Sequence, residues 1–255
     1  MMKFLLVIIA ALAGFTGYTA INNTTTMNNL IDQGTSIIKK DNSLEELDIG
    51  EYKTVLVYKI IPFKSKVYYI EGIGVLAIMT LNLGIMEQFT LNINPFEKDL
   101  AQLTIDYTIA FRTRQLRVEI YELMVNKDDT SYKNFLQKID DINSEYSDLE
   151  DIPLSETWSN EYMPASILKS GGVKDDKKFL ELFTELMETY MEYAKDAPTL
   201  SKEDQNKKYE AIKGFSDLLV EKGGIAIDNF KKSIGDEKTN EFLGKVLYGY
   251  LHAKK

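Results

Sequence analysis

The hydrophobic period of the chain changes once along its length, and this change limits the possible folds more than any other feature of the sequence. Between residues 54 and 124, runs of Val, Ile, Tyr, Phe and Thr are separated by turn residues, a pattern that predicts β-strands. The connections between them are short, which favours an antiparallel meander. The expected strands cover 54–61, 65–84, 87–94, 101–111 and 115–124.

The C-terminal part of the chain has a helical pattern instead. Apolar residues recur at three- and four-residue spacing over 177–196, and a second helix is predicted from Ser201 to just before Gly223, with two further helices after it. The acidic stretch 126–176 between strands and helices is expected to be a loop that Trp158 anchors to the core. Strands followed by helices predict an α+β fold with helices packed on an antiparallel sheet.

The N-terminal residues are typical of a targeting sequence. Lys3 precedes a short apolar run that ends in small residues, so we interpret 1–20 as a secretory signal peptide, with an N-terminal membrane anchor as the alternative. Residues 21–48 begin with an Asn- and Thr-rich stretch and are expected to be a flexible or transit-like leader, and 49–255 a single domain. The protein is therefore expected to enter the secretory pathway, either for a plastid reached through a bipartite leader or for secretion.

The composition excludes several kinds of chemistry. The chain has no cysteine and one histidine, His252, which excludes thiolate metal sites, thiol nucleophiles and His-based catalytic triads. Its 30 basic and 39 acidic residues give a net charge of -9, which makes nucleic acid an improbable partner because phosphate binding needs a concentrated basic surface. We expect no bound metal.

Two predicted strands place polar residues along one face. Thr90 and Asn92 alternate with apolar residues in 87–94, and Asp106 alternates with them in 101–111. This polar face is open to water in one interpretation. In the other, helices cover it, and a buried carboxyl there has a raised pKa and serves as a proton donor.

Several segments, in their order and spacing, resemble the ferredoxin-dependent bilin reductases. The C-terminal stretch NFKKSIGDEKTNEFLGKVLYGY resembles the end of that family, and FTLNINPFEKDLAQLTIDYTI is similar to its paired strands around a proline. The stretch WSNEYMPASIL and the helices that follow it come in the same order as in the family. These segments lie at 229–250, 89–109, 158–168, 177–196 and 201–222, and together they span most of residues 50–250.

The resemblance implies an α/β/α sandwich that holds a linear tetrapyrrole (bilin) between a central antiparallel sheet and C-terminal helices. It implies reduction of the bilin with electrons from ferredoxin and no tightly bound cofactor. Asp106 corresponds to the proton donor of the family, one residue short of its place as counted from Pro95, and Glu71 to an acidic residue on an earlier strand. The substrate-binding candidates are Thr90, Asn92, Arg112, Arg114 and Lys222.

The chain also departs from the family pattern. Thr90 stands where some members have a histidine, and an aspartate used by several members is missing near Gly223. A net negative charge opposes docking of an acidic ferredoxin, unless the arginine cluster at 112–117 provides a local positive surface. Two alternatives therefore stay open: a tetrapyrrole-binding or escort protein without activity on the same fold, and a secreted α+β protein that binds an unrelated ligand. The related red chlorophyll catabolite reductases share the fold and use only carboxylates, so a missing histidine does not exclude catalysis.

Overall fold

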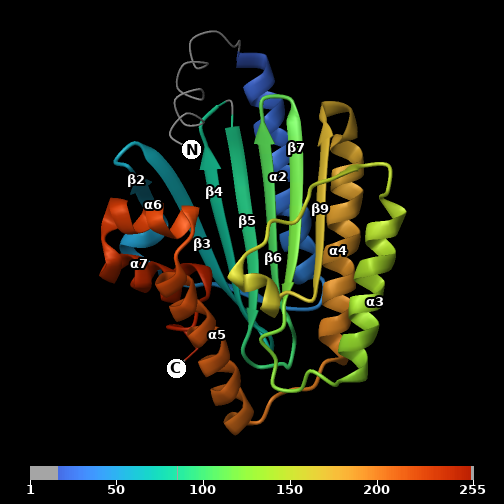
Figure 1. The fold of residues 1–255 in the computed structure, drawn as a ribbon, viewed down its shortest axis with the longest axis vertical. Coiled ribbons are helices and arrows are strands. Elements are labelled where there is room, and N and C mark those ends of the chain that lie inside the picture. Colours follow the sequence, from blue (N-terminus) through green and yellow to red (C-terminus); the bar gives the residue numbers. More distant parts are fainter. Residues whose placement is uncertain (1–16, 85, 254–255) are drawn as a thin grey trace.

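The computed structural model describes residues 17–84 and 86–253. Its strands form one antiparallel sheet in the order β1-β3-β4-β5-β6-β7-β9-β8, and β2 also pairs with β3 (Figure 1). The strands are β1 (Leu44–Glu46), β2 (Thr54–Val57), β3 (Ile61–Ile70), β4 (Gly74–Asn82), β5 (Met86–Pro95), β6 (Gln102–Ala110), β7 (Thr113–Tyr121), β8 (Glu150–Asp151) and β9 (Ala165–Gly172). The meander predicted over residues 54–124 is confirmed.

Helices lie on both faces of this sheet (Figure 1). One layer holds α2 (Gly17–Lys39), α3 (Thr130–Glu145) and α4 (Asp176–Asp196), and the other holds α5 (Lys202–Lys222), α6 (Ile225–Ile234) and α7 (Asp236–Phe242). A π-helical turn, Leu243–Leu247, continues α7. The predicted α+β fold, an α/β/α sandwich with C-terminal helices on a central antiparallel sheet, is confirmed.

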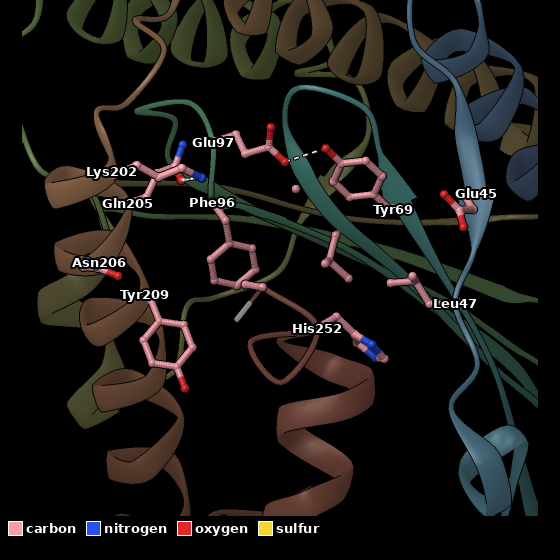
Figure 2. Close-up of a pocket in the computed structure, with 13 residues that line it drawn as sticks. Glu45, Leu47, Tyr69, Phe96, Glu97, Lys202, Gln205, Asn206, Tyr209 and His252 are labelled. Atoms are coloured by element: carbon pink, nitrogen blue, oxygen red, sulfur yellow. Dashed lines mark hydrogen bonds between the residues drawn. The ribbon is translucent and has the colours of Figure 1, made fainter. Parts of the chain in front are cut away.

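The C-terminal layer begins at α5, whose ends follow from its capping residues. The Ser201 hydroxyl accepts a hydrogen bond from the Asp204 backbone N–H at 3.2 Å, and Gly223 ends the helix with a φ of 71°. Both boundaries agree with the sequence prediction. A cleft remains between α5 and the edge of the sheet formed by β1 and β3, with Phe96 at its centre (Figure 2).

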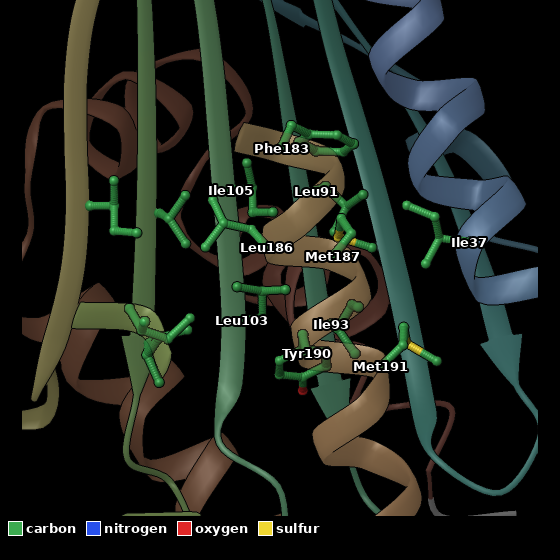
Figure 3. Close-up of a cluster of buried hydrophobic side chains, with 14 of the residues drawn as sticks. Ile37, Leu91, Ile93, Leu103, Ile105, Phe183, Leu186, Met187, Tyr190 and Met191 are labelled. Carbon is green, nitrogen blue, oxygen red and sulfur yellow. The ribbon is translucent and has the colours of Figure 1, made fainter. Parts of the chain in front are cut away.

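The larger apolar core lies between the sheet and the layer of α2, α3 and α4. Alternate residues of β5 and β6 point from the sheet toward α4, as Figure 3 shows. Full burial of each such side chain contributes about 1.5–3 kcal/mol. The labelled members of this cluster are Ile37 of α2, Leu91, Ile93, Leu103 and Ile105 of the sheet, and Phe183, Leu186, Met187, Tyr190 and Met191 of α4.

The prediction of a loop over 126–176 is wrong. The Asp129 carboxylate caps α3 by accepting hydrogen bonds from the backbone N–H groups of Ser131 and Tyr132. Residues at helical spacing along α3, such as Phe135 and Ile139, are buried against α4. β9 pairs with β7 along its length, so only the connecting segments of this stretch are loops. Trp158 begins a short 3-10 helix, Trp158–Tyr162, before β9 and packs on Phe215 of α5, as expected.

The prediction of a flexible leader over 21–48 is also wrong. Leu30 and Ile38 of α2 are 1% and 0% exposed and belong to the core, and β1 pairs with β3. The predicted signal peptide lies outside the described residues except for its last four, which begin α2. Within the described residues, none of the helices combines the length and the hydropathy that crossing a membrane requires.

Arg114 connects two helices of the first layer, α2 and α4, to the sheet. It is 1% exposed, and its Nε lies 2.6 Å from Asp176 Oδ1 at the start of α4, while its Nη2 donates to Asn23 Oδ1 of α2 at 3.0 Å. The neighbouring Glu87 is also buried, and it accepts a hydrogen bond from the Thr24 hydroxyl at 2.7 Å. Burial raises the pKa of Glu87, while Thr24 and Arg114 act in the opposite direction.

Replacement of Arg114 tests this role. Arg114→Met leaves the partly buried Asp176 and the buried Glu87 without their cation, so we expect the free energy of unfolding to fall by about 2–3 kcal/mol. Urea denaturation measures the change. Arg112→Met is the matched control, because Arg112 is exposed in the β6–β7 turn, and its effect is expected to stay within about 0.5 kcal/mol. Equal effects of the two substitutions would contradict the assignment.

Candidate functional site

The candidate site is the polar face of strands β5, β6 and β7, on the side of the sheet that faces the C-terminal helices. In the strand register, Asp106 lies opposite Thr90 on β5 and Arg117 on β7, and the next row on this face pairs Thr104 with Glu119. The Thr90 hydroxyl donates a hydrogen bond to Asp106 Oδ1. The alternation predicted from the sequence therefore brings Thr90 and Asp106 together as expected.

Asp106 is the group of this face whose ionisation is most clearly altered. Burial raises its pKa to about 6; the hydrogen bonds from Thr90 and Gln88 and the charge of Arg117 lower it, and the negative charge of Glu119 raises it further. The residue still retains partial exposure, so it is half-buried rather than sealed from solvent. A carboxyl group of this kind exchanges its proton near neutral pH and remains open to a ligand.

Glu119 is a second acid of this face, and the sequence analysis missed it. Its Oε1 accepts a hydrogen bond from Arg117 Nη2 at 3.0 Å, and its Oε2 accepts one from the Tyr121 hydroxyl at 2.8 Å. The pKa of Tyr121 is raised by burial and by Glu119. The signal in the sequence was the period-two spacing of residues 117, 119 and 121, which places all three on one face of the strand.

Five aromatic side chains pack together beside these acids, and we call them the aromatic wall: Tyr121, Trp158, Tyr162, Phe215 and Tyr248. Phe215 of α5 is at its centre, with ring centroids 5.0 Å from Tyr121 and 6.1 Å from Tyr248. Trp158 and Tyr162 extend the wall, at 5.6 and 5.3 Å from the Phe215 ring. Phe215 and Tyr248 are 3% and 4% exposed, whereas Tyr121, Trp158 and Tyr162 are half-buried. The site therefore combines two carboxyl groups with three partly exposed aromatic rings.

Asn92 and Asn94 hold the C-terminal segment against the sheet. Their side-chain amides donate to the Leu247 carbonyl at 2.8 and 2.9 Å, which satisfies an oxygen left free at the end of the π-helical turn. Asn92 Oδ1 also accepts from Gln102 at 3.1 Å and from Thr104 at 3.2 Å. Asn92, a predicted substrate ligand, is therefore engaged at both ends of its amide in internal contacts.

The remaining predicted site residues are not gathered at Asp106. Glu71 is exposed in the β3–β4 turn, where its carboxylate accepts a hydrogen bond from the Ser43 hydroxyl. The residue of β3 that lies in the same row of the sheet as Asp106 is Ser65, six residues before Glu71. At 3.3 Å per residue this is a displacement of about 20 Å along the strand, so Glu71, predicted as a second catalytic residue, does not lie beside Asp106. Arg114 lies on the opposite face of the sheet, which also contradicts its prediction.

Two predicted cations lie at the edges of the structure. Arg112 is exposed in the β6–β7 turn, six residues from Asp106 along the chain. Lys222 is exposed at the end of α5, with its Nζ 3.7 Å from a Glu221 carboxylate oxygen. Among described residues, Arg117 is the basic residue that lies directly opposite Asp106. In the same part of the chain, we find no group of three or more His, Cys, Asp or Glu side chains arranged to hold a metal ion.

Comparison with known proteins identifies a structural relative. No protein-family model matches the chain, and no curated protein matches it. Among solved structures, a phytochromobilin synthase from tomato, crystallised in complex with biliverdin, superposes with a TM-score of 0.71 at 13% sequence identity. The match covers 88% of this chain and 83% of that one. The chain therefore has the fold of a bilin reductase, the fold that the sequence resemblance implied.

The raised pKa of Asp106 predicts a pH-dependent stability difference. Its pKa is about 6 in the folded protein and about 3.9 in an unfolded chain. Between these two pH values the folded state binds more protons than the unfolded state, so the free energy of unfolding falls as the pH rises from about 4 to above 6. Asp106→Asn removes this loss. Between about pH 4 and pH 7.5, the unfolding free energy of the variant relative to wild type is expected to increase by about 1–2 kcal/mol, allowing for partial exposure. Urea denaturation at both pH values tests this, and a difference independent of pH would contradict it.

Proposed function

We propose that this protein binds a linear tetrapyrrole against the polar face of β5, β6 and β7 and reduces it, with electrons from ferredoxin and a proton from Asp106. The observation that carries the proposal is the half-buried Asp106 carboxyl, with a pKa of about 6, in a fold shared with a biliverdin-binding phytochromobilin synthase. The fold alone would not support this function, because one fold can host many functions, so the proposal rests on the fold and the acid together.

The chemistry of a bilin suits the groups on this face. A bilin is a flat conjugated chain of four pyrrole rings with N–H donors and two propionates. The half-buried rings of the aromatic wall, Tyr121, Trp158 and Tyr162, offer an apolar surface for the pyrrole rings. The carboxylates of Asp106 and Glu119 can accept hydrogen bonds from pyrrole N–H groups. The Arg117 side chain, 41% exposed, is the cation placed to bind a propionate.

In this proposal Asp106 delivers a proton during reduction. Reduction of one bilin double bond consumes two electrons and two protons, and ferredoxin supplies electrons one at a time. Each added electron makes the bilin more basic, so a neighbouring acid with a pKa near the working pH can protonate it. The Thr90 hydroxyl then stabilises the carboxylate that remains, and the negative charge of Glu119 favours its reprotonation.

The proposed electron donor requires a docking surface and a suitable compartment. The net charge of -9 opposes an acidic ferredoxin, and Arg114 is buried and contributes nothing to the surface. Arg112 and Arg117 are the members of the arginine cluster that reach solvent. Because ferredoxin is a plastid protein in algae and plants, the proposal favours the plastid over secretion as the destination.

A non-catalytic tetrapyrrole carrier is the second candidate function. It is favoured by the threonine at position 90, where some bilin reductases have a histidine, and by the distance of Glu71 from Asp106. In this case the same face would bind the pigment without a complete set of proton donors.

The proposed function predicts separate effects on binding and turnover. Biliverdin added to the purified protein is expected to give a shifted visible spectrum that persists through gel filtration. Addition of reduced ferredoxin is expected to bleach it. Asp106→Asn keeps the shape of the site, so we expect unchanged biliverdin affinity within about twofold and a reduction rate lower by about 100-fold or more. Stopped-flow absorbance under anaerobic conditions measures the rate.

The control is Asp128→Asn, which makes the same chemical change at a side chain that is 94% exposed in the loop before α3. Its affinity and rate are expected to match those of the wild type. A wild type that binds biliverdin stably but is never bleached would favour the carrier, and a wild type that does not bind it would exclude both functions. An Asp106→Asn variant with an unchanged rate would contradict the assignment of the proton donor.

A further inference from the structure

The cleft around Phe96 lies on the same side of the sheet as Asp106 but across the C-terminal turn from it. Its volume is about 640 Å³, and it is bounded by α5 on one side and by β1 and β3 on the other (Figure 2). The C-terminal turn separates the cleft from Asp106, because Gly249 of this turn packs directly on Val75 of the sheet. The contact is so close that a Cβ added at Gly249, whose φ is 66°, would lie 2.4 Å from the Val75 side chain. A volume of this size suits a small organic ligand.

The cleft is lined by aromatic rings. Phe96 lies at its centre, with Tyr69 of β3 on one side and Tyr209 of α5 on the other (Figure 2). Phe96 and Tyr209 are 6% and 7% exposed, so the surrounding structure holds them in place. Ring faces attract cations through their quadrupole, and they also bind the apolar part of a ligand.

The side of the cleft formed by the sheet carries negative charge. Glu45 of β1 lines the cleft; its backbone pairs with Tyr69 of β3, and among the described residues its side-chain carboxylate has no hydrogen-bond or ion-pair partner. Glu97 Oε1 accepts a hydrogen bond from the Tyr69 hydroxyl at 2.6 Å, which places a second carboxylate beside a ring. The lining also has two basic residues (Figure 2). Lys202 lies on the opposite wall, where its Nζ donates to Gln205 at 3.1 Å, and His252 lies in the C-terminal turn, with its Nε2 2.9 Å from the Lys245 carbonyl oxygen.

We propose that this cleft is a binding site for an organic cation, an ammonium group carried on a flat or apolar body. Glu45 and Glu97 lie on either side of the Tyr69 side chain (Figure 2), so either carboxylate could bind the charged group while the three rings bind the remainder of the molecule. An anionic ligand of the same shape would meet Glu45 and Glu97 and be repelled. The inference rests on residues that the proposed bilin site does not use, so either can fail without the other.

A matched pair of probes tests the charge preference. Phenethylammonium and 3-phenylpropionate have the same ring and chain length and carry opposite charges. We expect phenethylammonium to bind with a dissociation constant of about 1 mM or tighter, as is reasonable for a ligand of this size, and 3-phenylpropionate at least about fivefold more weakly. Titration followed by amide NMR shifts locates the binding, with the largest shifts expected at Phe96, Glu97 and Tyr209.

Substitutions at two adjacent acids test the location. Glu45→Gln is expected to weaken phenethylammonium binding about fivefold or more, because it removes the unpaired carboxylate of the cleft. Glu46→Gln is the control: it is the next residue of β1, is also exposed, and does not line the cleft. Equal binding of the two probes, equal weakening in the two variants, or no saturation up to about 20 mM would overturn the proposal.

Discussion

The hydrogen bonds from the Asn92 and Asn94 amides to the Leu247 carbonyl are the interaction on which the functional part of the structure depends. They attach the end of the π-helical turn to the middle of the sheet. The segment that follows then carries Tyr248 into the aromatic wall and Gly249 onto Val75. One anchor thus covers part of the polar face near Asp106 and separates this face from the cleft around Phe96.

The ionisation of Asp106 follows from this arrangement. A carboxyl on an open antiparallel sheet would be solvated and ionised at neutral pH. Here the surrounding protein desolvates it, and its hydrogen bond from Thr90 only partly compensates, so its pKa stays near 6. Holding an ionised acid in this environment costs stability at neutral pH. Such a cost is common at functional sites, where shape and charge serve binding or catalysis rather than stability.

The strands and the last four helices were predictable because their patterns are dictated by burial on one face. The alternation in β5 and β6 also placed Thr90 and Asp106 together. The sequence analysis missed α2 and α3 because polar and acidic residues dilute their apolar stripes, and only packing against α4 and the sheet shows that Leu30 and Phe135 are core residues. The face on which Arg114 lies follows from the same alternation, because it is in phase with the buried Leu116 and Val118. The distance of Glu71 from Asp106 depends on strand register, which residue type and spacing do not reveal.

The most direct test of this account is the pKa of Asp106 measured in the intact protein. Aspartate labelled with carbon-13 at the side-chain carboxyl gives one NMR signal per residue, and the Asp106→Asn variant assigns the signal of interest. A titration midpoint of about 6 for that signal is the predicted result. A midpoint near 3.9, the ordinary value for aspartate, would show a solvated carboxyl and would contradict both the desolvated site and the proton donor built on it.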